Sequence, residues 1–228
     1  MTDWFAGEVA ERYDKSTAGM PVEPVVDFLE PLAHGGALEL AIGTGRIAVP
    51  LAQRGVRVAG IDFSPDMVAE LRKKTDEIPV EIGDMSATTV DGTFSLVYVV
   101  FNSINNVTTQ DGQVAAFANA AAHLEPGGCF VVEVGVPNTQ PLEVFDLSDT
   151  HVGVDEFDAD TQRLVSHPFS LVDGEWRRLS VPFRSVSPAE LDLMARLAGM
   201  ELRERWADWD RSPFTAESTK HVSVWQKT

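Results

Sequence analysis

The chain begins with two segments whose apolar residues recur at helical spacing. They lie within residues 3–33 and are separated by KSTAGMP at residues 15–21. Apolar residues three and four positions apart form one face of an α-helix. The pattern therefore predicts two amino-terminal helices, with apolar faces made of Trp4, Phe5, Val9 and Tyr13 in the first and Val25, Val26, Leu29 and Leu32 in the second.

From residue 37 the pattern changes to short apolar runs that alternate with amphipathic segments. The runs are ALELAI, VRVAGID, VEIGD, FSLVYVVF and CFVVEVGV. Runs that are apolar on both faces are typical of central strands in a parallel sheet covered by helices. Ser64-Pro65 predicts the start of an intervening helix, and Gly127-Gly128 predicts the end of another. Glu70 and Lys74 are spaced as an ion pair along one helix face.

The alternation of strands and helices breaks between residues 140 and 186. An acidic segment is followed by two β-like runs, 163–172 and 176–186, and Asp173-Gly174 between them is a strong hairpin signal. We interpret this stretch as an inserted antiparallel flap rather than a second domain. After it, SPAE at 187–190 predicts a capped helix, followed by strands near 201–206 and at HVSVWQK.

Composition limits the partners and the compartment. The net charge of −17 comes from 35 acidic and 18 basic residues and repels polyanions, so we expect neither nucleic acid nor an anionic membrane as partner. With Cys129 as the one cysteine and five histidines without ligand spacing, we expect no disulfide and no metal. The longest apolar run is too short to span a bilayer, and the amino terminus lacks the apolar region of a secretory signal. We therefore expect a cytoplasmic protein.

A glycine-rich turn follows the first expected strand. In ELAIGTGR, Gly43 and Gly45, with Ala48 after them, match the dinucleotide pattern G-x-G-x-x-A, and Asp62 lies about where a ribose-binding acid belongs. Such a turn serves a pyrophosphate cofactor, as in an NAD(P)-dependent oxidoreductase, and also a sulfonium cofactor. The turn alone does not decide between them.

Three acidic residues favour the sulfonium cofactor. Glu39 lies in the first strand, Asp62 ends the second and Asp84 follows the third. Because the carboxyl ends of neighbouring parallel strands open into one crevice, these side chains gather there. Like charges repel by roughly a kcal/mol or more at contact in partly screened surroundings. A pyrophosphate is therefore disfavoured, whereas S-adenosylmethionine brings an ammonium and a sulfonium.

The chemistry of S-adenosylmethionine suggests a role for each nearby residue. Asp62 is expected to accept hydrogen bonds from both ribose hydroxyls, and Asp84 from the adenine amine. Gly43 and Gly45 allow the backbone to approach the cofactor, and Arg46 is placed to meet the methionine carboxylate. Three further side chains are expected to sandwich the adenine ring, namely Phe63, Met67 and Met85, with ordinary core filling as the alternative for the two methionines.

Five motifs carry a resemblance to a known family: ELAIGTGR, GIDFSPDM, EIGDMS, FNSINNV and HLEPGGCFVVEV. Over roughly residues 37–136 they resemble the class I S-adenosylmethionine-dependent methyltransferases. The later stretch SPAELDLMARLAGMELRERW is similar to bacterial members that methylate small molecules or peptide natural products. The resemblance implies an α/β fold with a Rossmann-like seven-stranded sheet, its last strand antiparallel, flanked by helices and with an insertion after the fifth strand.

The resemblance implies that residues 1–228 form a single methyltransferase domain, whose parts have separate tasks. It implies an amino-terminal helical lid over residues 1–35 and a cofactor-binding core over 37–136. The antiparallel flap over 140–186 is expected to shape the acceptor site, and residues 187–228 supply a helix and the last strands.

Further site residues follow from the motifs. Ala41 stands where family members have the first glycine, and Ala41, Glu39 and Phe101 of FNSINNV are included among the expected cofactor contacts. The resemblance places a tyrosine of the YD type, here Tyr13, over the methyl-transfer region, with simple packing of the first helix as the alternative. Asn102 ends the fourth strand, where its amide can orient an acceptor, unless NSINN is ordinary turn chemistry.

These features predict an enzyme that transfers a methyl group from S-adenosylmethionine to a nitrogen or oxygen of a small molecule or peptide and releases S-adenosylhomocysteine. Holding donor and acceptor in attack geometry can supply roughly 7–11 kcal/mol of the barrier, so no catalytic dyad is required. The alternatives are an NAD(P)-dependent oxidoreductase and a non-catalytic S-adenosylmethionine-binding protein. The acceptor side is expected to be lined by Trp4, Phe5, Phe169 and Trp176.

The flap also holds two candidate bases. His151 and His167 lie within it, with a solvated loop histidine as the alternative for each. The expected oligomeric state is a monomer or a homodimer.

Overall fold

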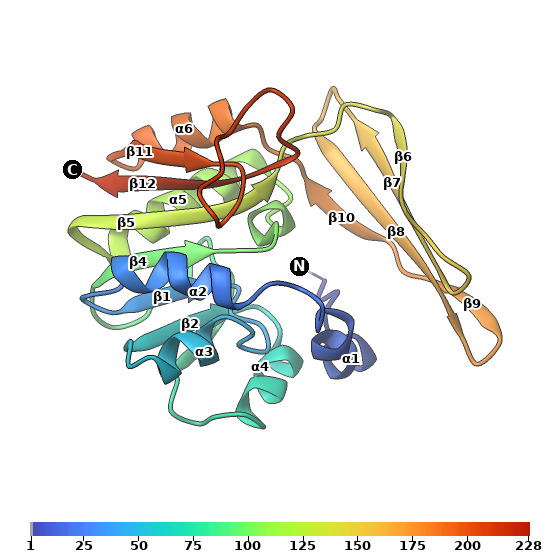
Figure 1. Ribbon diagram of the computed structural model, residues 1–228, viewed down its shortest axis with the longest axis horizontal. Coiled ribbons are helices and arrows are strands. Elements are labelled where there is room, and N and C mark those ends of the chain that lie inside the picture. Colours follow the sequence, from blue (N-terminus) through green and yellow to red (C-terminus); the bar gives the residue numbers. More distant parts are fainter. Residues whose placement is uncertain (1) are drawn as a thin grey trace.

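A seven-stranded sheet forms the centre of the computed structural model, which describes residues 2–228 (Figure 1). The strand order is β11-β12-β5-β4-β1-β2-β3. The strands are β1 (Ala37–Leu40), β2 (Val58–Asp62), β3 (Val80–Ile82), β4 (Phe94–Val99), β5 (Leu124–Gly135), β11 (Met200–Trp206) and β12 (Lys220–Lys227). Strands β1 to β5 run parallel, whereas β12 is antiparallel to both β5 and β11. The predicted fold class is confirmed.

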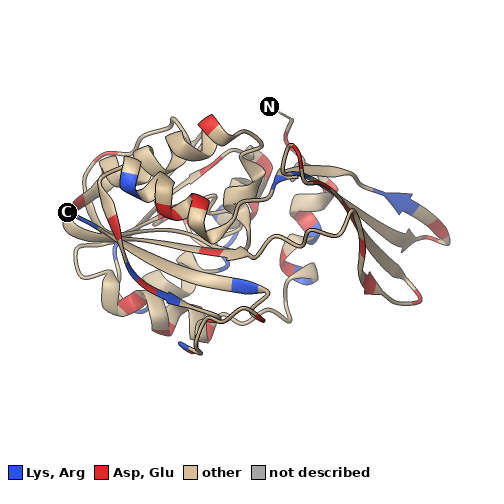
Figure 2. Cartoon of the chain, turned by 90° about the horizontal axis from the view of Figure 1, so that it is seen from above, with Lys and Arg blue, Asp and Glu red and all other residues tan. Residues whose placement is uncertain are grey.

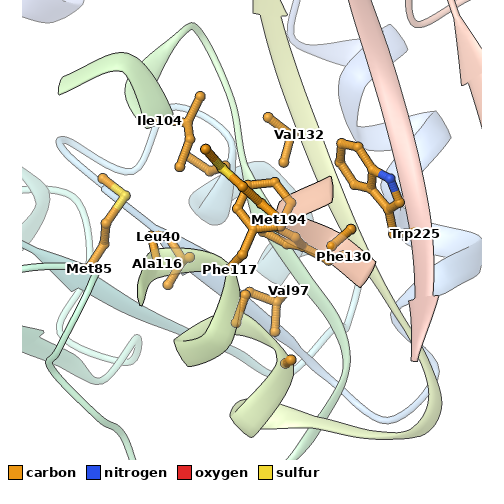
Figure 3. Close-up of a cluster of buried hydrophobic side chains, with 14 of the residues drawn as sticks. Leu40, Met85, Val97, Ile104, Ala116, Phe117, Phe130, Val132, Met194 and Trp225 are labelled. Atoms are coloured by element: carbon orange, nitrogen blue, oxygen red, sulfur yellow. The ribbon is translucent and has the colours of Figure 1, made fainter. Parts of the chain in front are cut away.

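Helices cover both faces of this sheet. They are α2 (Glu23–Leu29), α3 (Ala48–Gln53), α4 (Pro65–Arg72), α5 (Gln110–His123) and α6 (Pro188–Leu197), with short 3-10 helices η1 (Glu30–Leu32) and η2 (Ser103–Asn106). Helix α1 (Glu8–Ser16) lies apart from the sheet and packs on α4 (Figure 1). One buried cluster packs α2, α3 and Leu71 of α4 against the sheet, and a second packs α5 and α6 against it. Figure 3 shows the second cluster, in which the Phe117 ring meets Phe130 and Trp225 edge to face with centroids 5.0 and 5.5 Å apart.

Two predicted helix starts are confirmed by side-chain caps. The Ser64 hydroxyl accepts a hydrogen bond from the Met67 N–H at 3.4 Å, and the Ser187 hydroxyl accepts one from the Glu190 N–H at 3.3 Å. The predicted end at the Gly127-Gly128 pair is wrong, because α5 ends at His123 and both glycines lie within β5.

Two further local predictions are wrong. The first helix begins at Glu8, after Gly7 in a left-handed conformation with φ of 58°, so Trp4 and Phe5 precede it. Lys74 lies beyond the end of α4 and pairs with Asp14 at 2.5 Å instead of Glu70.

The insertion forms a separate antiparallel sheet that projects from the core (Figure 1). It consists of β6 (Leu142–Leu147), β7 (His151–Asp158), β8 (Arg163–Val172), β9 (Glu175–Arg178) and β10 (Val181–Arg184), in the order β10-β8-β7-β6 with β9 paired to β8. Asp173 and Gly174 form the predicted hairpin turn, with φ of 53° and 82°. The acidic segment, which we did not predict as strands, supplies β6 and β7. They form because β7 pairs with β8 over His151–Asp158 and β6 pairs in turn with β7.

The charge distribution matches the acidic composition. Figure 2 shows acidic residues on the helices of the core and on the flap. Within residues 2–228, no helix is long and apolar enough to cross a membrane.

Candidate active site

A cavity of about 320 Å³ lies at the carboxyl ends of the parallel strands, where the sheet order changes direction between β1 and β4. This volume falls within the range of small-molecule sites, roughly 300–1,000 Å³. The cavity brings together most of the predicted site residues, namely Tyr13, Glu39, Ala41, Gly43, Arg46, Asp62, Phe63, Met67, Asp84, Met85 and Phe101. Gly45 and Asn102 do not line it.

Asp62 joins two loops at the floor of the cavity. Its Oδ2 accepts a hydrogen bond from the Gly43 N–H at 2.6 Å, and its Oδ1 accepts one from the Ser64 N–H at 2.8 Å. The residue is 7% exposed, and this burial raises the pKa of its carboxyl group while the two backbone bonds oppose the rise. Sequence reasoning missed this second role, in which Asp62 holds the glycine turn against the start of α4.

Glu39 is the most deeply buried acid of the cavity. It is 2% exposed, and its Oε2 accepts a hydrogen bond from the Tyr98 hydroxyl at 2.9 Å. Burial raises the pKa of Glu39 to about 8, although the Tyr98 bond and the Arg46 charge lower it. The crevice therefore carries less negative charge at neutral pH than the three predicted carboxylates suggest, as long as no cation is bound.

Asp84, Phe63, Met67 and Met85 form the region expected to hold adenine. Asp84 Oδ1 accepts hydrogen bonds from the backbone N–H and the hydroxyl of Ser86, at 2.8 and 2.7 Å, which orders the loop after β3. Met67 and Met85 are buried, whereas Phe63 is 37% exposed, and all three side chains line the cavity. A flat apolar ring with an amine at its edge matches this set of groups.

The glycine turn contains one residue that strains it and one glycine that serves packing. Ala41 has a φ of 58°, in the left-handed region that favours glycine. Gly43, with φ of 57°, lines the cavity. A Cβ at position 45 would lie 2.3 Å from Leu71 Cδ1. Gly45 does not line the cavity, and its missing side chain makes room for α4.

Replacing Ala41 with glycine is expected to stabilise the protein. The left-handed conformation costs an L-residue about 1–2 kcal/mol, and the extra chain entropy of glycine offsets roughly 0.5–1 kcal/mol of the relief. We expect the free energy of unfolding in urea to rise by up to about 1 kcal/mol. Ala118→Gly, on the exposed side of α5, is the control and should lower it by about 1 kcal/mol. A loss of stability for Ala41→Gly would contradict this account.

Helix α1 is tied to the glycine turn. Asp14 accepts a hydrogen bond from the Thr44 hydroxyl at 2.5 Å and pairs with Lys74, whose Nζ also donates to the Thr44 carbonyl at 2.8 Å. Tyr13 lines the cavity and meets the Phe5 ring edge to face, with centroids 6.4 Å apart. Burial raises the pKa of the Tyr13 phenol, although the Arg46 charge lowers it, so the hydroxyl is protonated at neutral pH.

Asn102 is directed away from the cavity. Its Oδ1 accepts a hydrogen bond from the Gly135 N–H at 2.6 Å, and its φ is 59°. The expectation that its amide orients an acceptor is not met by this geometry, and the alternative of local turn chemistry describes it. The neighbouring Phe101, with φ of 54°, does line the cavity, and the Arg46 guanidinium lies 5.6 Å from the centroid of its ring.

The flap contributes less to the cavity than predicted. Trp4 and Phe5 line it as expected, but Phe169 and Trp176 do not. The residues that sequence reasoning missed include Asp3, Thr44, Ser103, Asn106, Thr108 and Pro182. Most of the flap projects outward, and among residues 2–228 Pro182 of β10 is its contribution to the cavity wall.

Neither flap histidine reaches the cavity. The Nδ1 of His151 lies 3.1 Å from the Ser170 hydroxyl, and the Nδ1 of His167 lies 2.8 Å from the Ser180 hydroxyl. Neither residue belongs to the cavity lining. In the part of the chain that the structure describes, no group of three His, Cys, Asp or Glu residues is placed to hold a metal ion.

Comparisons with known proteins agree with this geometry. A family model described as a methyltransferase domain matches residues 37–128. A dTDP-3-amino-3,4,6-trideoxy-alpha-D-glucopyranose N,N-dimethyltransferase of Streptomyces venezuelae is 33% identical over 67% of this chain and 62% of its own length. The chain thus spans less than two thirds of that relative. The cypemycin N-terminal methyltransferase of a Streptomyces species is 29% identical over 86% of this chain and 85% of its own length.

A solved structure matches the entire chain. The CcbJ methyltransferase from Streptomyces caelestis is 33% identical, with a TM-score of 0.87 and full coverage of both chains. The seven-stranded sheet, the cavity at its switch point and these relatives lead to one conclusion: the chain belongs to the class I S-adenosylmethionine-dependent methyltransferases.

Proposed function

We propose that this methyltransferase acts on an amine nitrogen of a small molecule or peptide natural product. Two of the relatives are named as N-methyltransferases, one of an amino sugar nucleotide and one of a peptide amino terminus. The observation that carries the proposal is that each acid among the described residues of the cavity wall already accepts a hydrogen bond from the protein itself.

The residues of the cavity fit the adenosyl donor. S-adenosylmethionine supplies an electrophilic methyl group on a positively charged sulfur. Asp62, Asp84 and Arg46 line the cavity. In this proposal Asp62 accepts hydrogen bonds from the ribose hydroxyls, Asp84 accepts one from the adenine amine, and Arg46 pairs with the carboxylate of the donor. Gly43 presents backbone without a side chain at the same wall.

The titratable residues of the wall do not suit deprotonation of a hydroxyl. They are Asp3, Tyr13, Glu39, Arg46, Asp62 and Asp84. The Tyr13 phenol keeps its proton at neutral pH. Asp3, Asp62 and Asp84 already accept backbone hydrogen bonds, and Glu39 accepts one from the Tyr98 hydroxyl. A hydroxyl needs a base before or during attack, whereas an amine can lose its proton to water and attack through its lone pair. The site therefore favours nitrogen over oxygen.

The parts of the chain divide the work in this proposal. Residues 37–136 bind the donor, and residues 187–228 complete the sheet. The lid over residues 1–35 and the flap over 140–186 cover the acceptor, since Trp4, Phe5 and Pro182 line the cavity. The single cysteine, Cys129, is buried, which suits a reducing cytoplasm.

Replacing Tyr13 with phenylalanine tests whether the phenol acts chemically. If Tyr13 only lines the cavity, the kcat of Tyr13→Phe should stay within about tenfold of that of the unsubstituted protein. The kcat of Tyr13→Ala should fall much further, because the position of the acceptor depends on the ring. Steady-state kinetics with labelled donor measures both. A loss in Tyr13→Phe as large as that in Tyr13→Ala would assign the hydroxyl a role in proton transfer.

Matched amine and hydroxyl acceptors test the function itself. The protein is incubated with methyl-labelled S-adenosylmethionine and paired compounds: an amino sugar nucleotide against its hydroxyl analogue, and a peptide with a free amino terminus against its N-acetylated form. We expect label in the amines alone, with one S-adenosylhomocysteine released per methyl group. Labelled hydroxyl analogues would overturn the proposal. Tight S-adenosylhomocysteine binding with no product from any acceptor would favour a non-catalytic donor-binding protein.

A further inference from the structure

A buried arginine joins the flap to the core beside the cavity. Arg184 ends β10, and its side chain is 7% exposed. Its guanidinium donates to Gln113 Oε1 at 2.5 Å, to Gln162 Oε1 at 2.6 Å and to Glu190 Oε1 at 2.6 Å. These partners lie in α5, in the turn between β7 and β8, and in α6. One side chain thus connects two segments of the flap with two helices of the core (Figure 1).

Gln113 extends this connection to η2. Its side chain is fully buried, and its Nε2 donates to the carbonyl oxygens of Ile104 at 3.2 Å and of Arg184 at 3.1 Å. Ile104 lies within η2, whose Ser103 and Asn106 line the cavity. The same hydrogen bonds therefore hold both η2 and the backbone of β10.

The ion pair of this network is well supported. Glu190 also accepts hydrogen bonds from Gln110 Nε2 at 2.6 Å and from Gln162 Nε2 at 3.0 Å. Burial raises the pKa of Glu190, but the bonds from Arg184, Gln162 and Gln110 outweigh it, so that the pKa is lowered. The pair is therefore charged at neutral pH. Fully satisfied polar networks of this kind give a buried region one defined geometry.

The network ends at residues that face the acceptor side of the site. Pro182, two residues before Arg184, lines the cavity from β10, and Ser103 and Asn106 line it from η2. Apart from Phe101, which follows β4, the residues of the core expected to bind the donor lie instead within or after β1, β2 and β3. None of them contributes a hydrogen bond to the Arg184 network.

We propose that Arg184 is a positioning residue for methyl transfer, which fixes β10 and η2 and thereby places the acceptor relative to the donor methyl group. This inference rests on the proposed function, because it assigns these two segments to the acceptor. A misplacement of about 1 Å in such a site can lower the rate about 10²-fold. Loss of the guanidinium should therefore impair acceptor turnover and leave donor binding unchanged.

The test compares Arg184→Met and Arg184→Lys with a matched control, Arg205→Met. Arg205 is also buried, with a side chain 14% exposed, and it pairs with Asp192 of the same helix α6 at 2.7 Å. Its other side-chain hydrogen bond goes to Ser223 of β12, so it touches neither the flap nor η2. Calorimetry measures the Kd of S-adenosylhomocysteine, and steady-state kinetics measures kcat and KM for the acceptor. Hydrogen exchange measures the rate at which the backbone amides of residues 103–106 and 181–184 exchange with solvent.

In Arg184→Met we expect kcat/KM for the acceptor to fall by about tenfold to a hundredfold. The Kd of S-adenosylhomocysteine should stay within about twofold, and exchange should speed up in residues 103–106 and 181–184 but not in β1 or β2. Arg184→Lys should recover part of the loss, and Arg205→Met should show none of these effects. If Arg184→Met misfolds because Glu190 is left unpaired, the double variant Arg184→Met/Glu190→Gln removes that charge.

Two results would overturn the inference. One is unchanged exchange in both segments, and the other is a loss of donor affinity as large as the loss of acceptor turnover. The exchange measurement needs no acceptor. If the original protein methylates no amine, the proposed function fails, while exchange still decides whether Arg184 anchors β10 and η2.

Discussion

Replacing Asp62 with alanine is expected to weaken S-adenosylhomocysteine binding about a hundredfold, or about 2.7 kcal/mol. Asp62 lines the cavity and is the proposed acceptor for the ribose hydroxyls, and its carboxylate also holds the Gly43 and Ser64 N–H groups at 2.6 and 2.8 Å. The substitution removes the ribose contacts and releases the glycine turn at the same time. Hydrogen bonds to a charged group contribute about 1.5–3 kcal/mol each, so the combined loss is large. Calorimetric titration measures the Kd.

Two companion variants separate binding from folding. Asp62→Asn keeps one carbonyl acceptor and should fall between the original protein and Asp62→Ala in both affinity and stability. Asp27→Ala, on α2 and far from the cavity lining, removes an exposed carboxylate that pairs with Arg54 and should leave the Kd unchanged. If Asp62→Ala lowers the free energy of unfolding but leaves the Kd unchanged, Asp62 serves the turn alone and does not bind the ribose.

Replacing Glu39 with glutamine is expected to make the free protein more stable above neutral pH. The pKa of Glu39 is about 8 in the folded state against 4.5 as a free side chain. Between these values the folded state keeps a proton that the unfolded state releases, so stability falls as the pH rises through this window. The loss is about 1.4 kcal/mol for each pH unit of the window. Glutamine accepts the Tyr98 hydrogen bond without a charge, so the difference in stability between variant and original protein should widen from pH 5 to pH 8.

Urea denaturation of both proteins between pH 5 and pH 9 measures this difference. His221, whose pKa burial lowers to about 4, destabilises both proteins as the pH falls from 6.5 toward 4. Because that effect is common to the two proteins, it cancels in the comparison. Parallel stability curves would show that Glu39 is ionised in the free protein.

The protons released when the donor binds give a second measurement of the ionisation of Glu39. A sulfonium near the buried carboxyl favours its ionised form, so binding of S-adenosylmethionine should release more protons at pH 7 than binding of neutral-sulfur S-adenosylhomocysteine. Calorimetry in buffers of different ionisation enthalpy counts these protons. The difference between the two ligands should disappear in Glu39→Gln, and its persistence there would locate the proton elsewhere.

The donor side of the cavity was largely predictable from the sequence. Asp62 ends the buried strand β2, and Asp84 follows the short edge strand β3. These two strands are parallel, and the carboxyl ends of parallel strands lie at one edge of the sheet. Ser64 and Ser187 cap helices through hydrogen bonds within three residues, and so their effect is local. These inferences need only the order and the ends of the elements.

The acceptor side was not predictable in the same way. Asn102 occupies the expected strand end, yet its side chain binds Gly135 from the neighbouring strand. Trp176 has the right chemistry for an apolar wall, but β9 carries it outward, where it is 51% exposed. Arg184 and Gln113 are 71 residues apart, and nothing in the local pattern of either indicates their hydrogen bond.

The sequence by itself therefore determined the order of strands and helices in the core, the parallel sheet and the gathering of acids at its carboxyl edge, because periodicity and capping act over a few residues. Only the tertiary structure decided that Gly45 makes room for Leu71 and that Lys74 pairs with Asp14 of α1. It also decided that β10, and not Trp176, lines the cavity. The physical reason is that the direction of a side chain is set by packing against segments distant in the chain, and a linear pattern carries no information about which distant segment arrives there.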